Sequence, residues 1–171
     1  MWSTGYQVLP GQTEGKSSIV HHVLLYRDID GVTGTPENLN LDDYSSEHGW
    51  RCIGGSGIAG AELIGGWVPG IAPNETPEGA GLKIEPEDRL IMQVHYHPQG
   101  QDTTDSSTSV QLRLQQEPPT YGVEYRIQGA AVGTPASLLP GPNDSSADPE
   151  FLIPDGALGH TETMEIFVND I

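Results

Sequence analysis

The sequence has few basic residues and no long apolar run. Seven lysine and arginine residues stand against 24 aspartate and glutamate residues, which gives a formal net charge of −17. A surface this acidic repels phosphate backbones and the anionic face of membranes, so we expect no nucleic-acid partner. No stretch approaches the roughly 18 consecutive apolar residues of a membrane-spanning helix, so we expect no membrane insertion either.

Cysteine is equally scarce. Cys52 is the only cysteine, so the chain can form no internal disulfide. Its thiol is either free and buried, or paired with a cysteine of another chain or of a missing segment. The N-terminal sequence MWSTGYQVLP has neither the basic flank nor the apolar run of a secretory signal. This predicts an intracellular protein or one whose beginning has been removed.

Long helices are disfavoured, because 22 glycine and 14 proline residues interrupt the chain. The apolar segments are short and rich in β-branched residues, which is typical of β-strands. We therefore predict an all-β protein, an antiparallel β-sandwich or jelly roll, with a helical turn only at 39–50. The predicted strands cover residues 18–27, 62–68, 89–97, 109–115, 121–128 and 161–168.

A proline pair marks the predicted domain boundary. The segment EPPTYG at 117–122 follows the alternating strand at 109–115, and prolines of this kind end a strand. We expect a first β-sandwich domain at residues 1–117. Residues 118–171 are then a linker and the first strands of a second β-sandwich domain whose remainder is absent.

Histidines are the residues most informative about chemistry. Alternation on the predicted strand at 89–97 places His95 and His97 on one face. Neutral imidazoles presented together suit copper, zinc, iron or nickel, and Cu(II) has the highest affinity for such nitrogen sites. The sequence has neither the cysteine pairs nor the HExxH motif of zinc sites. The six histidines are His21, His22, His48, His95, His97 and His160.

The segment SSIVHHVLLY at 17–26 places two adjacent histidines in one predicted strand. Neighbours on a regular strand point to opposite faces, so His21 and His22 can bind one metal only if the strand bulges, bends or ends there, or if one ring binds through Nδ1. Both faces of this strand are apolar, which predicts burial on both sides, where an unpaired polar group costs about 1–3 kcal/mol. Either one ring faces the core and the other water, or a metal at the sheet margin, shared with His95, satisfies both.

Trp67 lies in the segment GWVPG, where glycines precede it and proline and glycine follow. This context is typical of a strand that ends abruptly beside a loop. We expect the indole to cover the end of the sandwich by core packing, rather than to bind a substrate.

Four segments, in this order, resemble a known family. IVHHVLLYRD, GWRCIGGSG, GAELIGGWVPGIAPNETPEGAGLKI and RLIMQVHYHP are similar to the first domain of the copper type II, ascorbate-dependent monooxygenases, which include the peptidylglycine α-hydroxylating and dopamine β-monooxygenases and their bacterial relatives. The resemblance covers residues 5–115. It implies one copper that supplies electrons and is bound by His21, His22 and His95. In that family the position two residues after the third ligand is not a ligand, so the resemblance makes His97 a residue beside the ligands or at the surface. The strand face that His97 shares with His95 instead leaves it as an additional ligand.

In that family a second domain holds the oxygen-activating copper on a His-x-His pair and a methionine, and the substrate binds between the domains. Residues 118–171 resemble the linker and first strands of that domain, without a downstream His-x-His pair. The resemblance thus implies the N-terminal part of a periplasmic or secreted two-copper enzyme, inactive alone, that uses ascorbate and dioxygen to hydroxylate a C–H bond of a small-molecule or peptide substrate. It also implies that Cys52 is half of a disulfide whose partner lies upstream of Met1.

Two alternatives remain open. The chain could be a non-catalytic copper-binding or interaction module that keeps the sandwich, or a purely structural sandwich whose histidines have polar surface roles. Sequence beyond Ile171 separates the first alternative from the enzyme, because a downstream His-x-His pair and a later methionine would support catalysis. Stoichiometric copper binding would exclude the second alternative.

Overall fold

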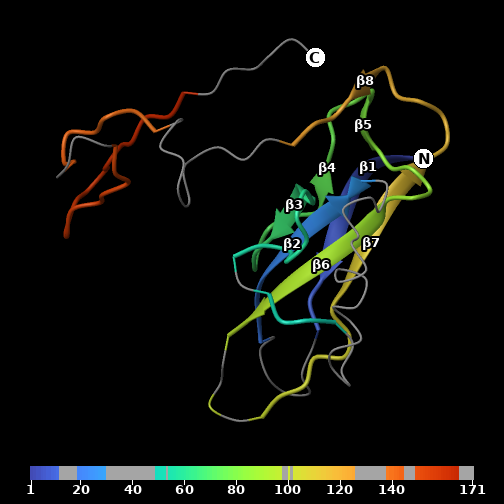
Figure 1. The fold of residues 1–171 in the computed structure, drawn as a ribbon, viewed down its shortest axis with the longest axis horizontal. Coiled ribbons are helices and arrows are strands. Elements are labelled where there is room, and N and C mark those ends of the chain that lie inside the picture. The colour runs from blue at the N-terminus through green and yellow to red at the C-terminus, as the bar shows by residue number, and fades with distance from the viewer. Residues whose placement is uncertain are drawn as a thin grey trace. The chain divides into compact units, whose positions relative to one another are not determined.

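The computed structural model describes residues 1–11, 19–29, 49–52, 54–97, 100, 102–125, 138–144 and 149–165 (Figure 1). These residues contain β-strands and no α-helix, which confirms the all-β prediction. No helix in the described part is long and apolar enough to cross a membrane. The chain divides into two compact units, Met1–Tyr125 and Arg126–Ile171.

All the named strands lie in the first unit. The predicted strands at 18–27, 62–68, 89–97 and 109–115 are confirmed. In the described part of the predicted segment 121–128, residues 121–125, strand structure covers two residues. Three further strands were not predicted from the sequence. In chain order the strands are β1 (Trp2–Leu9), β2 (Val20–Asp28), β3 (Glu62–Trp67), β4 (Asn74–Glu75), β5 (Ala80–Lys83), β6 (Arg89–Tyr96), β7 (Ser109–Gln115) and β8 (Tyr121–Gly122).

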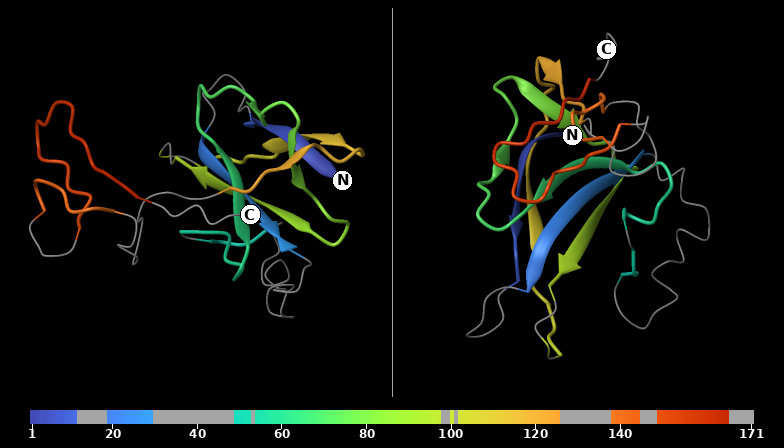
Figure 2. Two further views of the ribbon diagram at one scale, coloured as in Figure 1. Left: turned by 90° about the horizontal axis from the view of Figure 1, so that it is seen from above. Right: turned by 90° about the vertical axis from the view of Figure 1, so that its left-hand side faces the viewer.

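The strands form two sheets that face each other (Figures 1 and 2). One sheet has the order β3-β2-β6 and is antiparallel. In the other, β7 pairs with β1 along its whole length, while β4 and β5 pair with shorter parts of β1. β8 joins β5 in parallel, so the first unit extends beyond the predicted boundary at residue 117.

Apolar side chains from both sheets form the core between them. Large aliphatic residues of β2 and β3 pack against residues of β1 and β5, and this burial is the main stabilising contribution of the sandwich. Trp67 is partly buried against this cluster, as the GWVPG segment predicts. The buried residues of the cluster are Val8, Val20, Val23, Leu25, Ile64 and Leu82.

Tyr6 ties the two sheets together at one side of the core. Its hydroxyl donates to the carbonyl oxygen of Gly66 at 2.9 Å and accepts the N–H of the same residue at 2.8 Å. A Cβ atom on Gly65 would lie 2.6 Å from the Tyr6 ring. A side chain at position 65 would therefore displace the Tyr6 ring from this position.

A β-bulge interrupts β2 at its histidine pair. Val20 pairs with Tyr96 and His22 pairs with His95, so His21 has no residue opposite it on β6. The extra residue lets Val20 and Val23, three positions apart, both face the core, where they are 3% and 0% exposed. The expectation that β2 is buried on both sides is wrong, because His21 is exposed and His22 is half-buried.

The described residues of the second unit contain one isolated β-bridge. Leu138 pairs with Met164, and the N–H of Leu139 donates to the carbonyl oxygen of Thr163 at 2.9 Å. The strand predicted at 161–168 is reduced to this bridge in its described part, and residues 166–168 lie outside the described residues. Residues 39–48 of the predicted helical turn, including His48, also lie outside.

Candidate metal centre

Three imidazole rings meet where β2 and β6 pair beside the bulge. The rings belong to His21, His22 and His95, and one nitrogen of each lies within 4.8 Å of the other two. Nδ1 of His22 is 3.1 Å from Nδ1 of His21 and 3.3 Å from Nδ1 of His95. The ring centroids are separated by 4.6 to 5.3 Å. Nδ1 of His22 therefore lies close to Nδ1 of both other rings.

The two Nδ1–Nδ1 distances fit ligands of one metal ion. With metal–nitrogen bonds of about 2.0 Å, two ligand nitrogens lie about 2.8 Å apart at a right angle and about 3.3 Å apart at the tetrahedral angle. Hydrogen bonding alone accounts less well for the group, because a ring nitrogen carries either one proton or one lone pair. Nδ1 of His22 can therefore make one good hydrogen bond but has two close Nδ1 neighbours. A shared cation satisfies all three nitrogens at once.

The bulge explains how adjacent residues can share the site. On a regular strand His21 and His22 would point to opposite faces. The extra residue changes the local direction of β2, and bulges re-aim side chains in this way. His95 then completes the group, because it lies directly opposite His22 in the β2–β6 register. The sequence required a bulge, a bend or an Nδ1 contact for this convergence, and the structure has both the bulge and the Nδ1 contacts.

The protonation of His22 also favours metal binding. Partial burial, followed by the neighbouring His95 and His21 rings, lowers the pKa of His22 below its usual value of 6.5. A lowered pKa keeps the imidazole neutral near pH 7, which is the form that binds a metal. His21 and His95 are exposed, so a dissolved ion can reach the group.

Cys52 lies on the same face of the sheet but outside the histidine group. The Nε2 group of Gln93 donates to the Cys52 sulfur at 3.4 Å, and the Tyr26 hydroxyl donates to Oε1 of Gln93 at 3.2 Å. Burial and the nearby thiol raise the pKa of Tyr26. This chain of contacts fixes β6 at Gln93, two residues before His95, and Cys52 is a half-buried free thiol.

The other described histidines do not belong to the cluster of three ring nitrogens. His97 is exposed, and its ring stacks on His21 with centroids 6.1 Å apart and an interplanar angle of 29°. Its backbone N–H donates to the carbonyl oxygen of Ile19 at 2.8 Å. His160 belongs to the second unit, where its Nε2 lies 2.6 Å from Oε1 of Glu162.

A hydrogen-bond network at the end of β6 was not predicted from the sequence. The Tyr96 hydroxyl donates to Oδ2 of Asp105 at 2.9 Å, and Oδ1 of Asp105 accepts the N–H groups of Ser107 and Thr108. The Thr108 hydroxyl in turn accepts the N–H of Gly11 at 2.7 Å. Burial and the Asp105 carboxylate raise the pKa of Tyr96 to about 12. An aspartate followed two and three residues later by serine and threonine is the available signal, since such side chains cap turns.

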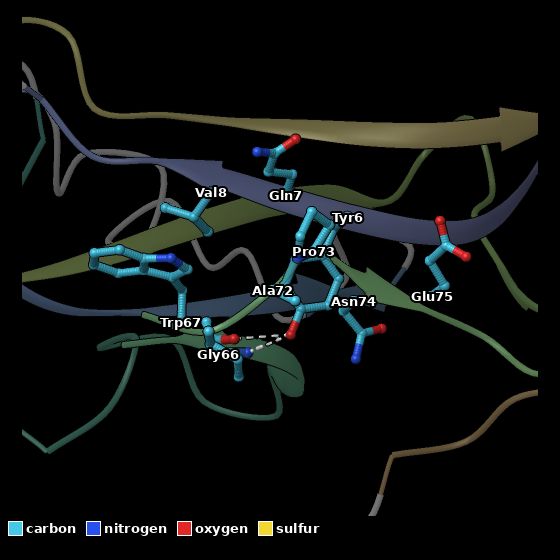
Figure 3. Close-up of a pocket in the computed structure, with 10 residues that line it drawn as sticks. Tyr6, Gln7, Val8, Gly66, Trp67, Ala72, Pro73, Asn74 and Glu75 are labelled. Atoms are coloured by element: carbon cyan, nitrogen blue, oxygen red, sulfur yellow. Dashed lines mark hydrogen bonds between the residues drawn. The ribbon is translucent and has the colours of Figure 1, made fainter. Parts of the chain in front are cut away.

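A separate pocket of about 380 Å³ lies beside β1 and β3 (Figure 3). The close-up shows the Trp67 indole near Val8, and the Tyr6 hydroxyl bonded to Gly66. The lining of the pocket contains no histidine or cysteine, and its one carboxylate, Glu75, is paired with Arg113. The histidine group is therefore the better candidate for chemistry. The pocket is lined by Tyr6, Gln7, Val8, Gly66, Trp67, Ile71, Ala72, Pro73, Asn74 and Glu75.

Comparison with known proteins adds no assignment to this geometry. The chain matches no protein-family model, no curated protein and no solved structure. Any inference about function therefore depends on the histidine group itself and on the order of the sequence segments that surround it.

Proposed function

We propose that this chain contains the electron-supplying copper domain of a two-copper, ascorbate-dependent monooxygenase. The observation that carries the proposal is the cluster of ring nitrogens from His21, His22 and His95 beside the β2 bulge, in which Nδ1 of His22 lies close to Nδ1 of both other rings. The resemblance of the surrounding segments to that family supports the same three ligands. Two independent arguments, one from geometry and one from sequence, thus select the same residues.

The choice of copper depends on ligand chemistry. Neutral imidazoles bind several divalent ions, and Cu(II) has the highest affinity of the series for nitrogen sites. Three imidazoles also leave a coordination position open, so the ion can change oxidation state without loss of the whole site. Zinc accepts the same three ligands, and the family resemblance is what favours copper over zinc.

The residues of the site have distinct tasks in this proposal. His22 is the central ligand, half-buried and held neutral by its surroundings. His21 and His95 are the exposed ligands, which leaves the ion accessible to an enediol reductant such as ascorbate. Copper supplies one-electron redox chemistry at this point.

Hydroxylation requires more than these residues. The proposal places the oxygen-activating copper on a further domain with a His-x-His pair and a methionine. There dioxygen would hydroxylate a C–H bond of a small-molecule or peptide substrate, in a periplasmic or secreted enzyme. The chain is then expected to bind copper and accept an electron. Without that further domain it should not hydroxylate a substrate.

Copper titration tests the site. Equilibrium dialysis of the tag-free chain against Cu(II), and against Cu(I) under anaerobic conditions, followed by elemental analysis, should give about one copper per chain. His95→Ala should abolish tight binding, because it removes one of three ligands. His160→Ala is the matched control, since it removes an imidazole of the second unit and should leave the stoichiometry unchanged. A wild-type stoichiometry near zero would contradict the proposal.

The redox assignment has its own readout. Ascorbate added to the Cu(II)-loaded chain should remove the electron paramagnetic resonance signal, and oxygen should restore it. Copper that ascorbate cannot reduce would favour the non-catalytic copper-binding module instead. The parent gene supplies a further check, because the enzyme requires a downstream His-x-His pair and a later methionine.

A further inference from the structure

We infer that His97 is a fourth ligand for Cu(II), which leaves the ion when it is reduced to Cu(I). The inference rests on the proposed copper site and adds an oxidation-state-dependent ligand to it. The observation that carries it is the stacking of the His97 ring on His21, with centroids 6.1 Å apart.

The distance places the His97 ring beside one of the three ligand candidates. Two imidazole rings bound to one ion have centroids about 4.5 Å apart at a right angle and about 6.3 Å apart when opposite, for bonds of about 2.0 Å. The His97–His21 separation of 6.1 Å lies inside this range. The nitrogens of His97 do not belong to the cluster that His21, His22 and His95 form within 4.8 Å. The His97 ring must therefore rotate toward the ion before it can bind.

The surroundings of His97 permit that rotation. Its backbone is fixed, because its N–H donates to the Ile19 carbonyl oxygen at 2.8 Å at the start of β2. Its side chain is exposed, and its ring contacts the ring of His21. An exposed side chain changes rotamer at little cost. The position of the residue is therefore constant, while its ring can bind or leave.

Copper chemistry gives a reason for the ring to bind in one oxidation state only. Cu(II) prefers a tetragonal set of ligands, so three imidazoles leave it short of one donor. Cu(I) has a filled d shell and needs fewer nitrogen ligands. If an enediol reductant such as ascorbate donated one electron to Cu(II), the neutral His97 imidazole would leave the ion with its electron pair. His21, His22 and His95 would hold Cu(I).

Two variants of the full chain separate a ligand from a stacking partner. His97→Phe keeps an aromatic ring against His21 but has no nitrogen, whereas His97→Ala removes both the ring and the nitrogen. Because the residue is exposed, both variants should fold, and circular dichroism checks this. Affinities for Cu(II) and Cu(I) are measured by competition with chelators, and the nitrogen donors of Cu(II) by electron paramagnetic resonance.

A ligand role predicts the same result for both variants. Cu(II) affinity should fall by about tenfold or more, because loss of even an outer-shell partner of a metal ligand costs about 10–100-fold, while Cu(I) affinity stays unchanged. A tenfold loss for Cu(II) alone raises the reduction potential by about 59 mV. The Cu(II) spectrum should also change from four nitrogen donors to three.

Other outcomes would overturn the inference in different ways. If His97→Phe matches the wild type while His97→Ala binds weakly, His97 only supports His21 by stacking. If both variants lose Cu(I) and Cu(II) affinity equally, His97 does not respond to oxidation state. In both cases the three-histidine site survives. If the wild-type chain binds no copper, the proposed function fails together with this inference.

Discussion

Nδ1 of His22 lies 3.3 Å from Nδ1 of His95, although the two residues are 73 positions apart in the chain. The antiparallel pairing of β2 with β6 brings them directly opposite each other. The bulge one residue earlier adds His21 to the same point. The geometry of the candidate site therefore follows from one strand pairing and one irregularity in it.

The lowered pKa of His22 predicts how the metal-free protein responds to acid. The folded state holds this imidazole neutral below its usual pKa of 6.5, whereas the unfolded chain protonates it there. The unfolded state then binds more protons, so the free energy of unfolding should fall as the pH drops below 6.5. Urea unfolding across this pH range measures the effect, and His22→Gln should flatten the profile. An unchanged profile would show that His22 titrates normally.

Gly65→Ala should destabilise the sandwich. The added Cβ would lie 2.6 Å from the Tyr6 ring, so the ring, which two hydrogen bonds to Gly66 hold in place, would have to move. Overpacking of this kind costs about 1–3 kcal/mol. Gly122→Ala is the control, because a Cβ there meets nothing within 4 Å and should have little effect. Equal stability of the two variants in urea unfolding would contradict the close packing of Tyr6 on Gly65.

Asp105→Asn should lower the pKa of Tyr96 from about 12 toward its usual value of 10.0, because it removes the negative charge beside the hydroxyl. Burial of Tyr96 remains, so the pKa should stay above that value. The Tyr96 hydroxyl holds its proton more tightly in the folded protein than in the unfolded chain. This contribution to the free energy of unfolding is complete below pH 10.0 and is lost as the pH rises toward 12. Absorbance titration of tyrosinate in both proteins measures the change. A Tyr96 pKa that does not move would place Asp105 outside its electrostatic surroundings.

Trp67→Ala should lower the free energy of unfolding by about 3 kcal/mol, the lower end of the range for truncated aromatic residues, because the indole is only partly buried against the core. Trp67→Phe, which keeps much of the apolar contact, should cost less. Copper affinity should be unchanged in both variants if the role of Trp67 is packing. A stable Trp67→Ala protein with weakened copper binding would instead assign Trp67 to the metal site.

Strands with a clear apolar pattern could be predicted from the sequence, and strands built on small residues could not. β2 and β6 carry runs of aliphatic residues, and both were found. β1 was missed because two of its buried positions are Ser3 and Gly5, which carry no apolar pattern. β5 is short and contains Gly81. A Cβ atom at position 81 would lie 3.2 Å from the Pro119 side chain, so a small residue lies where an apolar pattern would need a large one. These strands are determined by tertiary pairing, which local pattern does not reveal.

The histidine group was predictable in its members but not in its surroundings. Two separated motifs indicated the histidines, and the family resemblance selected His21, His22 and His95 among them. Strand geometry required a bulge, a bend, a strand end or binding through Nδ1. The burial of the rings was predicted wrongly, because a regular alternation counts both faces of β2 as apolar. The bulge shifts that alternation by one residue, so Val20 and Val23 share the core face and the imidazoles face outward.

Anomalous diffraction at the copper edge from crystals of the copper-loaded chain tests the central claim most directly. The proposed site predicts one strong peak, about 2 Å from the Nδ1 atoms of His21, His22 and His95. A crystal of the His22→Ala variant, loaded in the same way, should lack this peak. A copper peak elsewhere in the wild-type chain, or none beside the β2 bulge, would contradict the three-histidine copper site.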